Sequence, residues 1–180
     1  VQKYGTEADP NNQAVCNQEK LNIHVSQIYP LLLCVYRKLD SEDFTRLLKS
    51  IVVISFRYNV ISNKPANEQE RVYNMASRYL NDNANVSFSD LIKKLTPVYP
   101  DDTAFKAAFT DKVLRTTEGR NKKVVRYILF ALEEQLTHNR FDIEDSRYTI
   151  EHIAPENPDD NWHHIDDARY EQFTYRLGNM

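Results

Sequence analysis

Glycine is scarce in this chain. Only three of its 180 residues are glycine, namely Gly5, Gly119 and Gly178. Barrels and sandwiches need many tight turns, and glycine is the residue that most readily adopts the backbone conformations of such turns. The scarcity therefore argues against an all-β fold and favours helices. Hydrophobic residues make up 41% of the chain, which is enough for a substantial core and is not the composition of a disordered protein.

Long apolar runs and cysteine pairs are also missing. Apolar runs such as Leu31–Tyr36 and Ile51–Ile54 are far shorter than the roughly 18 residues of a transmembrane helix. The first ten residues lack the charged and apolar regions of a signal peptide. Cys16 and Cys34 do not form a Cys-x-x-Cys pair, which favours two free thiols in a reducing cytoplasm. We therefore expect no membrane partner and a cytoplasmic location.

Apolar residues recur at helical spacing through most of the chain. With capping residues such as Ser41 and Ser87, the spacing predicts helices over residues 25–39, 41–61, 67–81, 87–96, 103–113 and 121–139. Apolar residues on every side between residues 47 and 61 indicate a buried central helix of a bundle. The core of this bundle is expected to contain Leu47, Leu48, Ile51, Val52, Phe56, Ile128, Leu129 and Leu132.

The pattern changes towards the C-terminal end. Apolar residues alternate at Tyr148, Ile150 and Ile153, and Pro155 follows, which predicts a short strand. The rest is loop-like, with one helical turn expected near residues 168–173. The fold is therefore predicted to be mainly α, divided into an irregular N-terminal arm (1–20), a helical domain (21–140) and a C-terminal segment (141–180).

Charge is unevenly distributed between these parts. Residues 141–180 hold three arginines and ten Asp or Glu, whereas residues 1–140 hold twenty basic and sixteen acidic residues. The net charge is therefore about −7 for the C-terminal segment and about +4 for the rest. Such an acidic segment suits DNA only where its carboxylates hold a metal ion. The alternative is a solvated acidic loop.

Glu151 and His152 are the strongest candidates for chemistry. A carboxylate binds Mg²⁺ through oxygen, and a neutral imidazole beside it takes a proton from water so that hydroxide can attack a phosphodiester. Adjacent side chains of a strand point to opposite faces, so the strand would have to bend for both to serve one site. Taken alone, the pair is weak evidence for catalysis.

The wider pattern resembles a known family. IEHIAPEN at 150–157, then Trp162 and RLGNM at 176–180, resembles the start of an HNH (ββα-metal) nuclease domain. It is most similar to the domain at the C-terminus of GmrSD-like modification-dependent restriction enzymes, directly over residues 147–180. The helices YPLLLCVYRKL and RYILFALEEQL are diffusely similar to the helical segment before that domain. The resemblance implies a helical bundle followed by the first part of a ββα-metal unit.

The resemblance also implies roles by position. His152 matches the general base, and Glu151 matches the first ligand of Mg²⁺ or Mn²⁺. Asn179 matches an asparagine that ties the loop containing Pro155 to the strand and does not touch the metal. In that family a further helix supplies the second ligand, and it would follow Met180. We therefore expect a fragment, a helical domain with the first part of a nuclease domain, that binds no metal and is inactive alone.

A basic run lies upstream of this motif. Between residues 112 and 126 it contains one acid, Glu118, and six basic residues that are candidate DNA contacts: Lys112, Arg115, Arg120, Lys122, Lys123 and Arg126. Lys122 and Lys123 fall near the start of a predicted helix, where the helix dipole favours anions such as phosphates. The alternative is a solvated loop.

Three other residues invite a metal or DNA interpretation. His163 and His164 follow Trp162, but adjacent histidines are poorly placed to bind one Zn²⁺ ion and no cysteine is near, which favours a surface loop. Trp162 is expected to anchor the loop rather than to stack on a base.

The sequence leaves functional alternatives open. The first is part of a metal-dependent DNA endonuclease that acts on modified phage DNA in a prokaryotic cytoplasm, with DNA and other domains of the same polypeptide as partners. The second is a helical interaction or DNA-docking module without catalytic activity of its own. The third is a plain structural helical domain in which the His-Ile-x-Pro motif is accidental.

Overall fold

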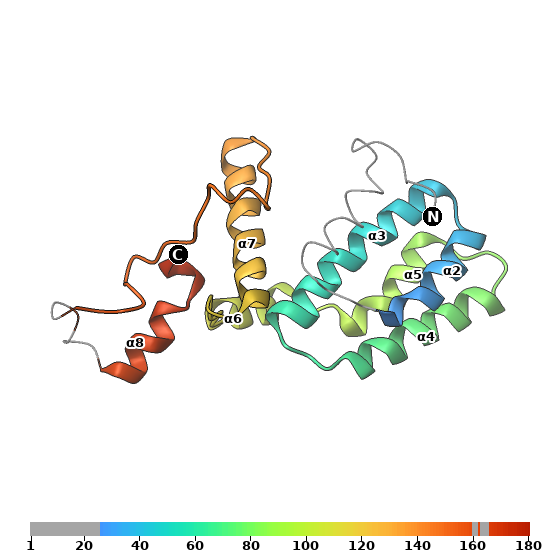
Figure 1. The fold of residues 1–180 in the computed structure, drawn as a ribbon. Coiled ribbons are helices and arrows are strands. Elements are labelled where there is room, and N and C mark those ends of the chain that lie inside the picture. Colours follow the sequence, from blue (N-terminus) through green and yellow to red (C-terminus); the bar gives the residue numbers. More distant parts are fainter. Residues whose placement is uncertain (1–25, 160–161, 163–165) are drawn as a thin grey trace. The chain divides into compact units, whose positions relative to one another are not determined.

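The computed structural model describes residues 26–159, 162 and 166–180. Within these residues the chain is mainly helical, as predicted, and has no β-strand (Figure 1). No described helix is both long enough and apolar enough to cross a membrane. The predicted arm, residues 1–20, lies outside the described residues. In chain order the elements are η1 (Ser26–Ile28), α2 (Tyr29–Lys38), α3 (Ser41–Ser55), the π-helix η2 (Phe56–Ile61), α4 (Ala66–Asp82), α5 (Phe88–Leu95), η3 (Thr96–Val98), α6 (Asp102–Thr110), α7 (Gly119–Thr137), α8 (Asp167–Thr174) and η5 (Leu177–Asn179).

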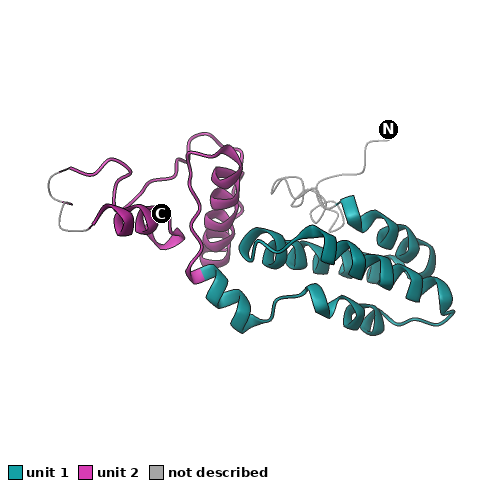
Figure 2. Ribbon diagram, turned by 90° about the horizontal axis from the view of Figure 1, so that it is seen from below, with its two compact units in different colours: residues 1–109 teal, residues 110–180 magenta. Residues whose placement is uncertain are grey.

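The chain divides by packing into two units, coloured separately in Figure 2. Unit 1 ends at Phe109 and unit 2 runs from Thr110 to Met180. Helix α7 falls in unit 2 because Arg126 binds backbone carbonyls between residues 143 and 148. The domain boundary at 140/141 was predicted from the change in sequence pattern, not from packing. It stays a prediction.

The helix starts of unit 1 follow local chemistry. Pro30 is the second residue of α2, so the helix begins beside it rather than kinking there. Ser87 caps α5, and its hydroxyl donates to Asp90 while accepting from the Asp90 amide, as predicted. The prediction that Ser41 caps α3 is wrong. The cap is Asp40, whose carboxylate accepts a hydrogen bond from the Asp43 amide at 2.8 Å. A carboxylate satisfies that amide and also favours the positive end of the helix dipole.

Unit 1 is held by an apolar core. Helix α4 packs against α2 and α5, and α2 also contacts α3 (Figure 1). The predicted core residues Leu47, Leu48 and Ile51 are buried, whereas Val52 and Phe56 are half-buried. Fully buried aliphatic side chains from these helices and η3 include Leu31, Val35, Leu47, Ile51, Leu80, Leu91 and Val98.

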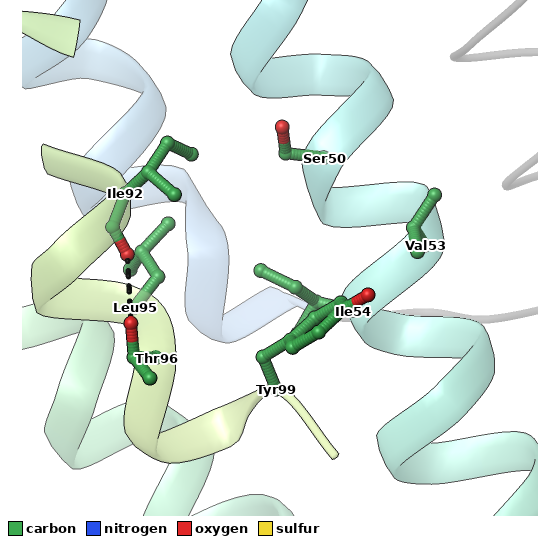
Figure 3. Close-up of a pocket in the computed structure, with 7 residues that line it drawn as sticks. All are labelled: Ser50, Val53, Ile54, Ile92, Leu95, Thr96 and Tyr99. Atoms are coloured by element: carbon green, nitrogen blue, oxygen red, sulfur yellow. Dashed lines mark hydrogen bonds between the residues drawn. The ribbon is translucent and has the colours of Figure 1, made fainter. Parts of the chain in front are cut away.

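A cavity of about 300 Å³ opens between α3 and the α5–η3 segment. Figure 3 shows the side chains that line it: Ser50, Val53, Ile54, Ile92, Leu95, Thr96 and Tyr99. The lining is apolar apart from hydroxyl groups and carries no carboxylate, imidazole or amine. It therefore offers no general base and no metal ligand.

Helix α7 of unit 2 is buried only over its first turns. Val124, Val125 and Ile128 are buried, and Leu129 is half-buried. The prediction that Leu132 belongs to the core is wrong, because its side chain is 50% exposed. The apolar stripe continues to Leu136, and there Leu132 and Leu136 stay exposed while lining an open cavity with Phe141 and Tyr148 of the following segment.

The C-terminal segment contains a helix rather than a strand. The helical turn expected near residues 168–173 is present as α8. The strand predicted around Ile150 is absent, and the described part of the segment is irregular there. Between residues 148 and 155 one long-range hydrogen bond joins two backbone groups, 2.8 Å from the Ile153 amide to the Asn179 carbonyl. A strand needs a ladder of such bonds, and residues 177–179 form a 3-10 turn instead of a partner strand.

Candidate active site

His152 lies in the irregular segment between α7 and α8. Its side chain is 9% exposed, and its ring stands edge-on to Tyr175 with centroids 6.0 Å apart. The Nε2 atom is 3.5 Å from the Thr116 hydroxyl and 3.8 Å from Oε1 of Glu156. The Thr116 hydroxyl donates a 2.9 Å hydrogen bond to the same Oε1. We call Thr116, His152, Glu156 and Tyr175 the His152 cluster.

Two backbone contacts bring distant parts of the chain to this cluster. Val113 and Arg176 form an isolated antiparallel bridge, and the Leu114 amide donates to the Tyr175 carbonyl at 2.8 Å. Thr116 follows Leu114 by two residues. The bridge therefore holds Thr116 and Tyr175 in one place, although they are far apart in sequence.

Asn179 fixes the loop that follows His152. It is 1% exposed, and its Oδ1 accepts from the Ala154 amide at 2.8 Å. Its Nδ2 donates to the carbonyls of Ala154 and Thr174, at 3.1 and 2.9 Å. The side chain thus pairs both backbone groups of Ala154, which is itself buried. Bonds of this kind are what the resemblance implies for this position.

The other motif residues also stabilise the loop. The Tyr170 hydroxyl donates a 2.8 Å hydrogen bond to the carbonyl of Pro155. Trp162 stands edge-on to Tyr170, with ring centroids 5.9 Å apart. This contact is consistent with an anchoring role for Trp162. His163 and His164 lie outside the described residues.

Glu151 is exposed to solvent, unlike the neighbouring His152. Its Oε1 accepts a 2.9 Å hydrogen bond from the Thr149 hydroxyl. Among residues 26–159, 162 and 166–180, no group of three or more His, Cys, Asp or Glu side chains could hold a metal ion. Glu151 therefore offers one hard oxygen ligand, and the described part of the chain adds no complete metal site around it.

Three members of the cluster were not predicted from the sequence. Thr116 lies within the basic run, Glu156 lies within the IEHIAPEN motif but was given no role there, and Tyr175 belongs to no motif. The spacing of four residues between His152 and Glu156 was a usable signal, although it carries meaning only once the loop path is known. Thr116 and His152 are 36 residues apart, and no local pattern predicts such a contact.

Three cations of the basic run are engaged within unit 2. Arg126 donates four hydrogen bonds to the carbonyls of Ile143, Asp145 and Tyr148. Arg115 pairs with a carboxylate of α8. Burial, and to a lesser degree the charge of a nearby arginine, lowers the pKa of the Lys112 amine. These three side chains are therefore poorly placed to meet DNA phosphates in this conformation.

The other three cations are exposed at the start of α7. Arg120, Lys122 and Lys123 lie in its first turns. Within the described structure their side chains make no hydrogen bond or ion pair. The side chain of Glu118, which precedes the helix, caps none of its backbone amides. This end of α7 therefore carries positive charge from both the side chains and the helix dipole.

Residues 99–180 match a protein family described as GmrSD restriction endonucleases, C-terminal domain. The matched range contains α6, α7, α8 and the whole His152 cluster. The match confirms the family resemblance inferred from the sequence, while the HNH assignment stays a prediction. Comparisons with curated proteins and with solved structures gave no match.

Proposed function

Because residues 99–180 of this chain match the family of GmrSD restriction endonuclease C-terminal domains, we propose that the chain serves phosphodiester hydrolysis of DNA. In this proposal His152 is the general base, and Glu151 is one ligand of a divalent cation, Mg²⁺ or Mn²⁺. The chain acts as part of a restriction endonuclease directed against modified phage DNA in a prokaryotic cytoplasm.

The environment of His152 is the observation that supports this role best. The imidazole is almost buried, with Nε2 facing a hydroxyl and a carboxylate. Within the described residues Nδ1 has no hydrogen-bond partner, so its lone pair can accept a proton from water. Transfer of that proton generates hydroxide. The hydroxide attacks phosphorus, and the bond from phosphorus to one of the two bridging oxygens breaks, so that this oxygen leaves.

The metal would supply stabilisation of the charge that develops on the phosphate and on the leaving oxygen. The carboxylate of Glu151 fits this ion in chemical type, because Mg²⁺ prefers oxygen ligands and commonly uses one or two carboxylates with water and substrate phosphates. The described residues supply one such carboxylate at the motif. The remaining ligands would come from the substrate, from water or from a further segment of the polypeptide.

The exposed cations at the start of α7 are proposed to bind DNA phosphates. Lys122 and Lys123 sit in the first turns of the helix, where the dipole favours bound anions. Arg120 adds a third charge on the same turn. Arg126 is left out of this proposal because four of its five donors already bind backbone carbonyls.

Replacement of the base tests the proposal. In the endonuclease that contains this chain, His152→Ala should lower the DNA cleavage rate by about 10²–10⁴-fold, which is the usual contribution of a general base. The helical circular dichroism signal should not change. His138→Asn is the matched control, since His138 is an exposed histidine with a left-handed backbone that asparagine tolerates.

Cleavage by His152→Ala at the wild-type rate would rule out this site. If DNA binding then still depended on Lys122 and Lys123, the chain would be a DNA-docking module rather than part of a catalytic centre.

A further inference from the structure

The carboxylate of Glu156 is fixed beside the imidazole of His152. Its Oε1 accepts the hydroxyl proton of Thr116 at 2.9 Å. The hydroxyl of Tyr175 lies near Glu156, and burial together with the Glu156 charge raises the pKa of that hydroxyl. Tyr175 therefore keeps its proton and remains a donor. The Thr116 hydroxyl thus holds a glutamate whose side chain is still 36% exposed, with the protonated Tyr175 hydroxyl nearby.

The loop itself is equally constrained. Asn179 pairs both backbone groups of Ala154, and Tyr170 binds the carbonyl of Pro155. Glu156 follows directly. The backbone on the N-terminal side of the glutamate is therefore held at two successive residues, and the Thr116 hydrogen bond holds the carboxylate itself beside His152.

The direction of these hydrogen bonds fixes the role of each imidazole nitrogen. A threonine hydroxyl has one proton, and here that proton goes to Glu156. The Thr116 oxygen can therefore offer Nε2 of His152 only a lone pair. The carboxylate oxygen offers a lone pair as well. Both groups that face Nε2 are acceptors, so the neutral imidazole carries its proton on Nε2 and its free lone pair on Nδ1.

We propose that Glu156, held by Thr116, is a positioning residue for His152. It keeps the Nε2–H group turned inward, directs Nδ1 towards the water to be activated, and stabilises the imidazolium that forms when Nδ1 takes the proton. A carboxylate behind a catalytic imidazole acts in this way in serine proteases. This inference rests on the proposed function of His152.

The variants Glu156→Gln and Thr116→Val test it in the intact endonuclease. We expect kcat for DNA cleavage to fall by about 10–100-fold, as when outer partners of a functional histidine are removed, with KM unchanged. Glu156→Asp should recover part of the rate. Glu144→Gln is the control, because it removes the same charge from unit 2 and the Glu144 carboxylate is exposed and makes no described contact.

Imidazole NMR of the ¹⁵N-labelled 180-residue chain provides a second readout that needs no cleavage. The Nε2–H resonance of His152, assigned by its loss in His152→Asn, should be observable in wild type. In Glu156→Gln and Thr116→Val it should shift and broaden through faster exchange with water. An identical resonance in wild type and Glu156→Gln would overturn the positioning role.

The two readouts separate this inference from the proposed function. Wild-type cleavage by Glu156→Gln, together with loss of cleavage in His152→Ala, would reject the positioning role and keep the nuclease site. Wild-type cleavage by His152→Ala would reject the site, and the NMR result would then decide only whether Glu156 orients the imidazole.

Discussion

The two units are stabilised by different kinds of contact. In unit 1, Leu47 and Ile51 of α3 have no exposed surface, and the described helices meet through aliphatic side chains of this kind. In unit 2 the described residues between α7 and α8 are irregular, and polar side chains bind their backbone. Arg126 binds three carbonyls of the segment after α7, and Asn179 binds both groups of Ala154.

This difference follows from what each backbone can do for itself. A helix satisfies most of its own amides and carbonyls, so unit 1 packs chiefly through apolar surface, and Lys38 binds free carbonyls at the end of α4. An irregular segment leaves those groups unpaired, and burying them without partners is costly. Unit 2 therefore uses arginine and asparagine where unit 1 uses leucine and isoleucine. The same irregular backbone can place an imidazole, a hydroxyl and a carboxylate together, which a regular helix face rarely does.

A mutation that creates a new cavity in the core of unit 1 should have the largest effect on stability. Leu47→Ala removes a fully buried side chain and should lower the free energy of unfolding by about 2–5 kcal/mol. Hydrogen exchange should show loss of protection in α2, α3 and α4. Val53→Ala, on the same helix but 45% exposed, is the control and should cost much less. If the two variants lost equal stability, the core assigned to α3 would be wrong.

A polar truncation in unit 2 should have a smaller effect. Asn179→Ala leaves the amide and carbonyl of Ala154 without their partners and should cost about 1–3 kcal/mol. The amide of Ala154 should then exchange faster, whereas unit 1 amides should not change. Gln172→Ala, at an exposed position of α8, serves as the control. Unaltered exchange at Ala154 would mean that the loop is held by other contacts.

The smallest change in stability, with a clear change in DNA binding, is expected at the start of α7. Reversing Lys122 and Lys123 to Glu should weaken DNA binding and reduce the slope of log affinity against log salt by about 2, roughly one unit per lysine. Reversal of Lys93 and Lys94, an exposed tandem pair in α5 of unit 1, should leave both quantities unchanged. Equal effects from the two pairs would indicate non-specific attraction by net charge.

Local signals in the sequence determined much of this protein. Apolar spacing and the cap at Ser87 predicted the helices, because helix hydrogen bonds join residues four apart and depend on nearby side chains. The His152-to-Asn179 motif likewise pointed to the family that residues 99–180 match.

Tertiary structure alone decided the surroundings of the site. The side chains that face Nε2 of His152 come partly from Thr116, 36 residues away, and Arg126 of the basic run turned out to bind carbonyls rather than solvent. The predicted strand is absent. Alternation of apolar residues determines only which side chains would lie on one face if the segment were extended. A strand also needs a partner with free backbone groups at the right distance. Such long-range pairing depends on the path of the whole chain, which the periodicity of a short segment does not contain.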